Sequence, residues 1–239
     1  MKQRVAVIGA QGRLGRFACA LLERSHDFEL VARVAASDDL EAVISETHPV
    51  VALDVTRAGL GCEHGLRLIA LGVRPVIGTS GVSLAETRAL DEAARARGLG
   101  GLVVPNFSLG MSLLQRAAVE AAQQFEACEI IELHHDQKRD APSGTALDTA
   151  ERMRAARGAQ APEIPIHSVR LAGLYAHQVV IFGSAGETYT LRHDMSGPEG
   201  FGEGIGIALT HALTAVGVGR GLSVALGPAA GNNRTTAEG

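Results

Sequence analysis

The densest group of reactive side chains lies in the run ELHHDQKRDAPSGTA, between residues 132 and 146. It contains His134, His135 and Lys138, followed by Ser143-Gly144-Thr145, a segment typical of a helix start. Cationic side chains beside the free N–H groups of a helix N terminus favour a bound anion. We therefore interpret the run as a pocket for a small dicarboxylate, in which Lys138 and His135 supply charge and the 143–145 segment donates hydrogen bonds. His134 would move a proton near neutral pH.

Two alternatives to this pocket are less consistent with the sequence. A zinc site needs converging ligands, whereas His134, His135 and Asp136 are neighbours that would point in different directions on a strand. A solvated loop before a capped helix explains any one of these residues, but not the whole set. Lys138 is also one of only two lysines, with Lys2, against 20 arginines. Its location therefore needs an explanation of its own.

A second motif, Gly9-Ala10-Gln11-Gly12-Arg13-Leu14-Gly15, follows the first predicted strand and opens the first predicted helix. Such glycines let backbone N–H groups approach a pyrophosphate, which predicts a dinucleotide site. No acidic residue ends the second strand in the place usual for NAD; Asp38 and Asp39 come two or three residues late. Arg13 or Ser37 could accommodate a 2′-phosphate, which favours NADPH, although Arg13 could equally be a solvated cation and NADH stays open.

Polar segments at the ends of later strands complete the predicted cleft. They are residues 54–56, Gly78-Thr79-Ser80-Gly81 and Val104-Pro105-Asn106-Phe107. Each alone has the composition of a turn. Because the carboxyl ends of parallel strands face one crevice, together they predict a lining for a nicotinamide.

The elements that must position these residues fall into two groups. Short apolar runs at 5–8, 30–35, 50–55, 75–77 and 102–104 alternate with helix-periodic stretches, and Ser83 and Glu86 form a capping-box pattern. This order predicts an α/β, Rossmann-type parallel sheet. After residue 107 come a helix at 111–125, a strand at 129–134, a helix opening at 143–145, and strands at 167–171, 177–182 and 187–192. Successive strands predict a second, α+β domain with a mixed sheet.

We accordingly divide the chain into a dinucleotide-binding domain at 1–107 and a substrate-binding and oligomerisation domain at 108–214. A helix at 201–216 would bring the chain back, so that residues 215–239 rejoin the first domain, ending in a frayed tail at 227–239.

Composition excludes several classes of protein. The chain has 26 acidic and 22 basic residues, two Tyr, six Phe and no Trp, which argues against nucleic-acid binding. No apolar run approaches the roughly 18 to 20 residues of a membrane span. The short apolar stretch after Lys2 and Arg4 does not fit a signal peptide, so we expect a cytoplasmic protein. Cys19, Cys62 and Cys128 show neither disulfide nor zinc spacing and are expected in the core.

The motifs together resemble the bacterial 4-hydroxy-tetrahydrodipicolinate (dihydrodipicolinate) reductase family of lysine biosynthesis. The matching segments are GAQGRLG at 9–15, GTSG at 78–81, PNFSLG at 105–110 and, most specifically, ELHHDQKRDAPSGTA at 132–146. The resemblance implies a two-domain fold, NADH or NADPH on the first domain, a small dicarboxylate on the second, and a homotetramer assembled through the second sheet. It also implies reduction by hydride transfer with protonation.

Residue roles follow from the same resemblance. His134 would be the proton donor and acceptor and Lys138 the second catalytic residue. His135, Gly144 and Thr145 would bind substrate, with Ser143 beside them. The cofactor would lie against Gly9, Ala10, Gln11, Gly12, Arg13, Leu14, Ser37, Gly78, Thr79, Ser80, Val104, Pro105, Asn106 and Phe107.

Besides lacking the ribose acid noted above, the chain departs from the family pattern in three places. It is shorter than the usual member, Gln137 replaces a frequent His, and an Arg that often precedes the last helix is replaced around residues 197–199. Two alternatives therefore stay open. One is another two-domain nicotinamide-dependent amino-acid dehydrogenase. That alternative would not explain an HHxxK motif directly before an SGT helix start. The other is a non-catalytic NAD(P)H sensor.

Overall fold

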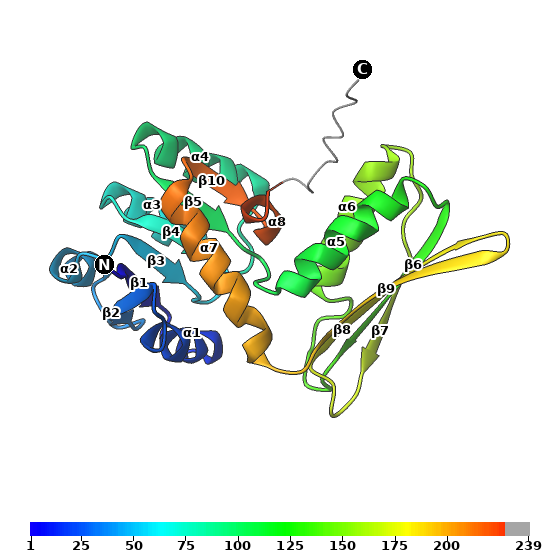
Figure 1. The fold of residues 1–239 in the computed structure, drawn as a ribbon, viewed down its shortest axis with the longest axis horizontal. Coiled ribbons are helices and arrows are strands. Elements are labelled where there is room, and N and C mark those ends of the chain that lie inside the picture. The colour runs from blue at the N-terminus through cyan, green and yellow to red at the C-terminus, as the bar shows by residue number, and fades with distance from the viewer. Residues whose placement is uncertain (228–239) are drawn as a thin grey trace, which may run out of the picture.

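The computed structural model describes residues 1–227 and contains two separate sheets, each packed against helices (Figure 1). In the first part of the chain, strands and helices alternate: β1 (Gln3–Ile8), α1 (Arg13–Glu23), β2 (Phe28–Val34), α2 (Leu40–Thr47), β3 (Val51–Asp54), α3 (Gly61–Ala70), β4 (Arg74–Ile77), α4 (Leu84–Ala96) and β5 (Gly100–Val103). A last strand, β10 (Gly217–Arg220), joins them. All six strands are parallel, in the order β10-β5-β4-β3-β1-β2. The Rossmann-type sheet predicted from the sequence is confirmed.

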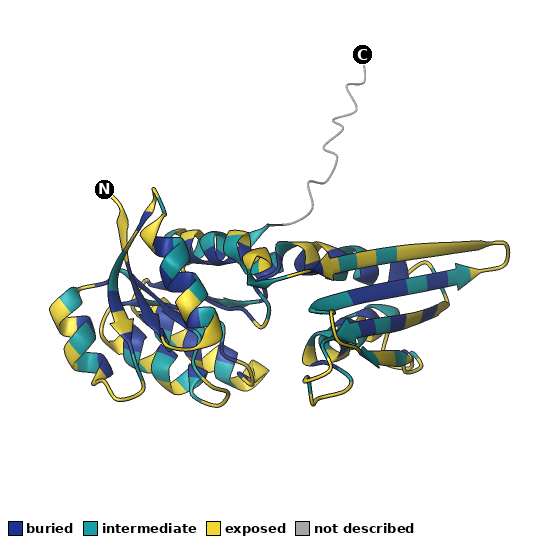
Figure 2. Cartoon of the chain, turned by 90° about the horizontal axis from the view of Figure 1, so that it is seen from below, coloured by how far each residue is buried: buried dark blue, intermediate teal, exposed yellow. Residues whose placement is uncertain are grey.

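Helices cover both faces of this sheet, which explains its uninterrupted apolar strands (Figure 2). Every residue of β3 and β5 is buried. The predicted capping box at Ser83 and Glu86 is present at the start of α4. The sequence analysis did not find α2 or β10, because α2 has only eight residues and β10 reads Gly-Val-Gly-Arg.

The strand order creates a crevice at the carboxyl edge of the sheet. β1 lies between β2 and β3, so the connections from β1 and β3 leave on opposite sides. A ligand crevice forms at such a switch point. The segments 9–15, 78–81 and 104–107 all follow the carboxyl ends of strands of this sheet.

The second sheet is mixed, as predicted. Its elements are α5 (Leu109–Ala122), β6 (Ala127–His134), α6 (Gly144–Arg157), β7 (Ile166–Arg170), β8 (Ala176–Ser184) and β9 (Glu187–Met195). The strand order is β7-β6-β8-β9, with β6 and β7 parallel and the other pairs antiparallel. Helices α5 and α6 lie on one face, where Ile130, Val180 and Phe182 join the core. The alternating burial of β6 leaves Glu129, Ile131 and Leu133 directed to the opposite face.

The chain returns to the first sheet through a helix. A 3-10 turn at Pro198–Phe201 leads into α7 (Gly202–Thr214), whose Ile205, Ala208 and Leu209 belong to the core of the first sheet. The return helix expected at 201–216 is thus present, and because its side chains pack on the first sheet we propose a domain boundary near residue 202 rather than at 214. After β10, the short α8 (Leu222–Ala225) is the last element of the part of the chain that the structure describes. The predicted frayed tail, from 228 onward, lies outside the described residues.

Within residues 1–227, no helix is long and apolar enough to cross a membrane. The three cysteines are free; Cys19 and Cys128 are buried and Cys62 is half-buried. The burial of Cys19 and Cys128 agrees with the expectation that the cysteines lie in the core, and Cys62 lies at its edge.

Candidate active site

The turn between β1 and α1 has the geometry of a dinucleotide cradle. Gly9 has φ of +81°, and a Cβ on Gly15 would overlap the Gly9 carbonyl oxygen. Gly12 caps α1 without a side-chain hydrogen bond, and the first turn has no acidic residue. The first N–H groups of α1 are therefore available to an anion, and the residues fit the pyrophosphate of a nicotinamide dinucleotide.

The carboxylates nearest to the expected ribose position are engaged elsewhere. Asp38 Oδ2 accepts a hydrogen bond of 2.7 Å from Ala35 N, and Asp39 caps α2 by accepting from Ala42 N. Arg13 and Ser37 are exposed at the same edge, and Arg13 makes no ion pair within residues 1–227. This edge can therefore offer a cation and a hydroxyl group.

A buried carboxylate, Asp54, joins two of the loops that face the crevice. The side chain is fully buried at the end of β3. Its Oδ1 accepts hydrogen bonds from Thr56 Oγ1 at 2.6 Å and Thr79 Oγ1 at 3.0 Å, and its Oδ2 lies 2.9 Å from His64 Nδ1. Burial alone would raise the pKa of Asp54, but the hydrogen bonds from His64 and Thr56 hold it below the usual value. The charged Asp54 thus fixes the loop that carries Thr79. The sequence analysis placed residues 54–56 in the cleft but gave Asp54 no role of its own.

On the second domain, His134 is held by a buried network that the sequence analysis missed. Glu132 is fully buried, and its Oε2 lies 2.5 Å from His134 Nδ1. Arg170 donates to both oxygens of Glu132, at 2.7 and 2.9 Å, and Ser143 N donates to Oε1 at 3.1 Å. Because a carboxylate only accepts, the Nδ1 atom of His134 carries the proton and Nε2 is free to exchange one with a ligand.

Burial lowers the pKa of His134, an effect that the hydrogen bond to Glu132 partly opposes. Burial also acts to raise the pKa of Glu132, but hydrogen bonds from Arg170, Ser168 and His134 keep it lowered. The His134 imidazole is thus neutral near pH 7. The Glu132 carboxylate beside it is charged and would stabilise the imidazolium form.

Lys138 lies at the same site but is paired with a neighbouring carboxylate. Its Nζ is 2.8 Å from both oxygens of Asp140. The Asp140 carbonyl accepts from Arg170 Nη2 at 2.7 Å, which ties this loop to the network around Glu132. A ligand carboxylate would therefore compete with the exposed Asp140 for the ammonium group.

The start of α6 leaves backbone donors free. Ser143 Oγ accepts from Ala146 N at 3.2 Å. Within the described chain, the N–H groups of Gly144 and Thr145 have no intramolecular acceptor. Asn106 Nδ2 reaches Thr145 Oγ1 at 3.4 Å and so links the first crossover to this helix start. Two free N–H groups at a helix N terminus fit one carboxylate.

Two adjoining pockets between the domains collect most of the predicted residues. Both are lined by Pro105, Asn106, His134, Ser143 and Thr145. The pocket of about 220 Å³ adds Leu14, Gly78 and Phe107 from the cofactor side. The pocket of about 430 Å³ adds Ser80, Lys138 and Gly144. A Cβ on Gly78 would overlap the Phe107 ring, so this contact requires glycine.

Other predicted residues do not line these pockets. Gly9, Ala10, Gln11, Gly12, Arg13 and Ser37 lie at the dinucleotide turn and the ribose edge, and Thr79 and Val104 are buried beneath the crevice. The His135 side chain lines neither pocket; its carbonyl accepts from Lys138 N at 3.2 Å. Within residues 1–227, no group of three metal-ligating side chains is placed to hold a metal ion.

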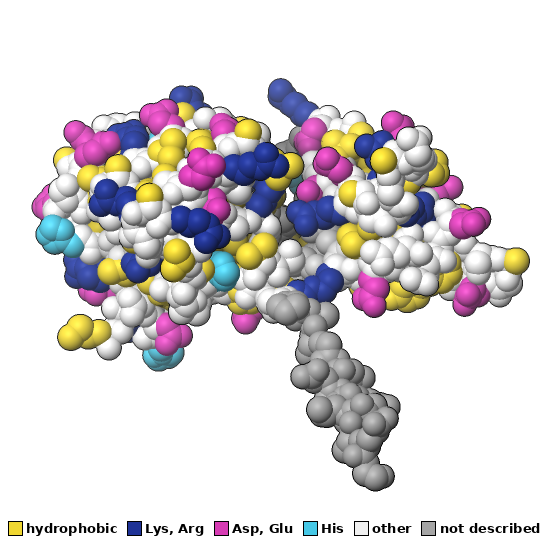
Figure 3. Space-filling view, turned by 90° about the horizontal axis from the view of Figure 1, so that it is seen from above, with side chains coloured by type: hydrophobic (Ala, Val, Ile, Leu, Met, Phe, Trp, Pro, Cys, Tyr) yellow, Lys and Arg dark blue, Asp and Glu magenta, His cyan; other side chains and the backbone are white. Residues whose placement is uncertain are grey.

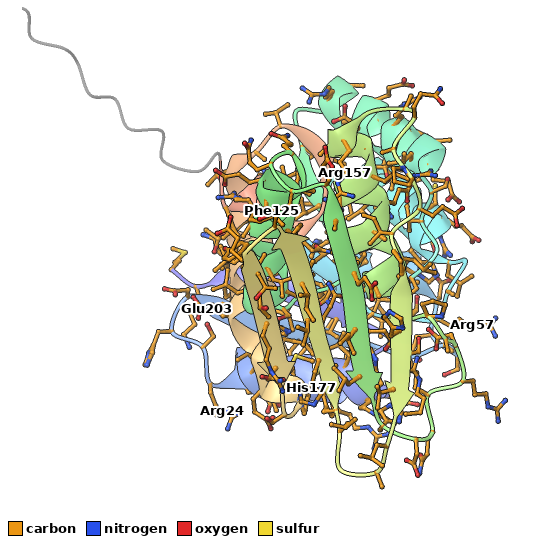
Figure 4. All side chains as sticks on the ribbon, turned by 90° about the vertical axis from the view of Figure 1, so that its right-hand side faces the viewer. Arg24, Arg57, Phe125, Arg157, His177 and Glu203 are labelled. Carbon is orange, nitrogen blue, oxygen red and sulfur yellow. The ribbon has the colours of Figure 1, made fainter. Side chains whose placement is uncertain are left out.

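The smaller pocket also contains two histidines that the sequence analysis did not name. His177 lies at the end of the second sheet opposite to Phe125 and Arg157 (Figure 4), and its Nδ1 is 2.8 Å from Asp194 Oδ1. His193 Nε2 lies 2.9 Å from Ser108 Oγ. Burial lowers the pKa of His193. Their sequence neighbours are ordinary strand residues, so no local signal marked them.

Comparisons with known proteins cover nearly the whole chain. Residues 3–107 match the family profile described as dihydrodipicolinate reductase, N-terminus, and residues 110–220 match dihydrodipicolinate reductase, C-terminus. A 4-hydroxy-tetrahydrodipicolinate reductase of Legionella pneumophila (strain Lens) is 41% identical, over 93% of this chain and 98% of that protein. One from Coxiella burnetii (strain Dugway 5J108-111) is 43% identical, over 80% of this chain and 85% of that protein.

Solved structures agree with these matches. A dipicolinate-bound dihydrodipicolinate reductase from Paenisporosarcina sp. TG-14 aligns with a TM-score of 0.84 and 33% identity, over 94% of this chain and 99% of that one. A diaminopimelate dehydrogenase of C. glutamicum aligns with a TM-score of 0.60 and 16% identity, over 95% and 96% of the two chains. The second likeness concerns the fold alone.

Proposed function

This chain belongs to the dihydrodipicolinate reductase family, and from that premise we propose that it reduces 4-hydroxy-tetrahydrodipicolinate to tetrahydrodipicolinate with a nicotinamide cofactor, in the lysine and diaminopimelate pathway. The observation that carries the proposal is the convergence, at one interdomain pocket, of His134 and the free N–H groups of Gly144 and Thr145. A biosynthetic reductase of this kind works in the cytoplasm, where we place the chain.

The proposed roles follow from the geometry. The N–H groups of Gly144 and Thr145 bind one carboxylate of the substrate, and Lys138 leaves Asp140 to neutralise it. His134 Nε2, which carries no proton in the neutral imidazole, takes up a proton from solvent and passes it to the ring, while Glu132 stabilises the charged imidazole in between. The nicotinamide, when bound, supplies the hydride. The protein therefore contributes orientation, charge matching and one proton. For His135, whose side chain lies outside both pockets, we propose a contact with the substrate from the loop that follows β6.

For the cofactor, we propose that NADPH binds at least as well as NADH. Asp38 and Asp39 each accept a hydrogen bond from a backbone N–H group, so both carboxylates already serve the local backbone, and neither follows β2 at the position usual for binding the ribose 2′-hydroxyl of NADH. Arg13 and Ser37 are exposed at the same edge and suit a 2′-phosphate.

The test is oxidation of NADPH and NADH, followed at 340 nm, with the product of dihydrodipicolinate synthase as substrate. We expect turnover with both cofactors and a KM for NADPH no higher than that for NADH. Tight cofactor binding without turnover would contradict the proposal and favour a sensor. Turnover with a different amino or keto acid instead would favour another dehydrogenase.

We further propose that the chain is a homotetramer assembled through the uncovered face of the second sheet. This face carries Ile131 and Leu133 from β6 and Ile181 from β8, all half-buried in the single chain. Light scattering should give four times the chain mass of 24.8 kDa. The Ile131→Glu variant should reduce that mass, because a charge on this face would be buried between copies. A parent protein of monomeric mass would contradict the assembly.

A further inference from the structure

The larger interdomain pocket is lined by more cations than carboxylates. Lys138 and Arg152 come from the second domain and Arg220 from the first. The acidic residues in the lining are Asp140 and Asp148. Figure 3 shows Lys and Arg side chains on both sides of the waist between the two lobes. A positive excess in a partly enclosed cleft favours an anionic ligand.

Of the three cationic side chains that line this pocket, Arg220 is the one without a carboxylate partner within residues 1–227. Lys138 is paired with Asp140 at 2.8 Å, and Arg152 Nε with Asp148 Oδ2 at 2.8 Å. Arg220 Nη1 donates to the carbonyl of Val82 at 2.7 Å, and within residues 1–227 its guanidinium makes no ion pair. One nitrogen is therefore fixed to an uncharged acceptor, and the remaining N–H donors of this half-buried side chain are free.

The backbone places Arg220 at the edge of the sheet where ligands bind. The residue ends β10, and Gly221 N donates to Val103 O at 2.7 Å, which anchors the turn beside β5. A Cβ on Gly221, which has φ of +89°, would lie 3.6 Å from Arg152 Nη2. Arg152 on α6 thus reaches the turn that carries Arg220. Two guanidinium groups, one from each domain, face the same cleft, and an anion between them would relieve their repulsion.

We propose that Arg220, supported by Arg152, binds the second carboxylate of the substrate and so selects dicarboxylates over monocarboxylates. This inference rests on the proposed function, in which the N–H groups of α6 and Lys138 take the first carboxylate. A second carboxylate on the same ring needs its own donors, and a planar guanidinium offers two parallel ones. Arg220 is therefore a specificity residue for the proposed reaction.

The test compares two ligands that differ by one carboxylate. Calorimetry with the cofactor-loaded protein would measure the Kd of pyridine-2,6-dicarboxylate and of pyridine-2-carboxylate. For Arg220→Gln we expect the dicarboxylate to bind about 10- to 100-fold more weakly, the loss of a charge-assisted pair, and the monocarboxylate to change little. Arg220→Lys should retain part of the preference. The exposed Arg88→Gln on α4 is the matched control and should change neither Kd.

Several outcomes would overturn the inference. An equal rise in the Kd of both ligands would mean that Arg220 only holds the loop that carries Val82. Weaker NADPH binding with an unchanged ligand preference would assign the guanidinium to a cofactor phosphate. An unchanged preference in a variant that keeps the parent's unfolding midpoint would also refute it. If the parent neither binds the dicarboxylate nor shows turnover, the proposed function fails and the inference with it. If the parent binds the dicarboxylate and shows turnover, but Arg220→Gln keeps the parent's ligand preference, only the inference about Arg220 is refuted.

Discussion

Replacing Lys138 by alanine should lower kcat by about 100-fold, the scale of effect expected when a group that positions the reacting substrate is lost. Lys138 lines the same pocket as His134 and the free N–H groups of α6, and its ammonium is held there by Asp140. Without the Lys138 ammonium group, the substrate carboxylate is no longer neutralised, and the reacting ring is no longer held in its orientation. The KM for the substrate should rise, whereas the Kd for NADPH should stay close to the parent value. Steady-state kinetics and cofactor titration measure these effects.

The other lysine gives a matched control. Lys2 is exposed and donates to Ser25 O at the start of β1, far from the crevice. Lys2→Ala should therefore leave kcat and both KM values unchanged. A kcat for Lys138→Ala within about threefold of the parent, in a folded protein, would remove Lys138 from the proposed mechanism.

Local sequence signals were sufficient for much of the fold and for the polar residues at the strand ends. The buried strands β3 and β5 have helices on both faces, so they read as continuous apolar runs. The glycine turn and the Ser-Gly-Thr helix start have compositions set by their own backbone geometry. The resemblance carried by the 132–146 run is confirmed by family matches over residues 3–107 and 110–220.

The partners of His134 could not be predicted because they depend on strand register. Arg170 is 38 residues from Glu132 in the sequence, and only the parallel pairing of β6 with β7 places Arg170 beside His134. A single shift in that register would turn the guanidinium to the other face. The packing role of the glycines in α7 could not be predicted either, because it depends on a neighbouring element: a Cβ on Gly204 would overlap Phe107 O.

The Glu132→Gln variant should lose about 3 kcal/mol of stability as well as activity. Glu132 is fully buried and Arg170 is 18% exposed, so removing the carboxylate leaves a largely buried guanidinium without its counter-charge. Denaturant unfolding at pH 7 would measure this loss. The folded pKa of Glu132 is lowered, so its contribution is present at neutral pH and fades as pH falls through that value. The stability difference between parent and variant should therefore shrink below about pH 4, where the carboxylate of the unfolded chain is itself protonated.

The same variant tests the coupling to His134. Because the carboxylate raises the pKa of His134 against the effect of burial, its loss should lower that pKa further. The limb of the kcat/KM profile that reports His134 should move to lower pH, a change that a purely structural defect would not produce. Glu63→Gln on α3, an exposed carboxylate that pairs with Arg67 away from the second sheet, is the control and should cost less than about 1 kcal/mol. If Glu132→Gln shifted neither the stability nor that limb, Glu132 would not be the group that holds the imidazole in its working state.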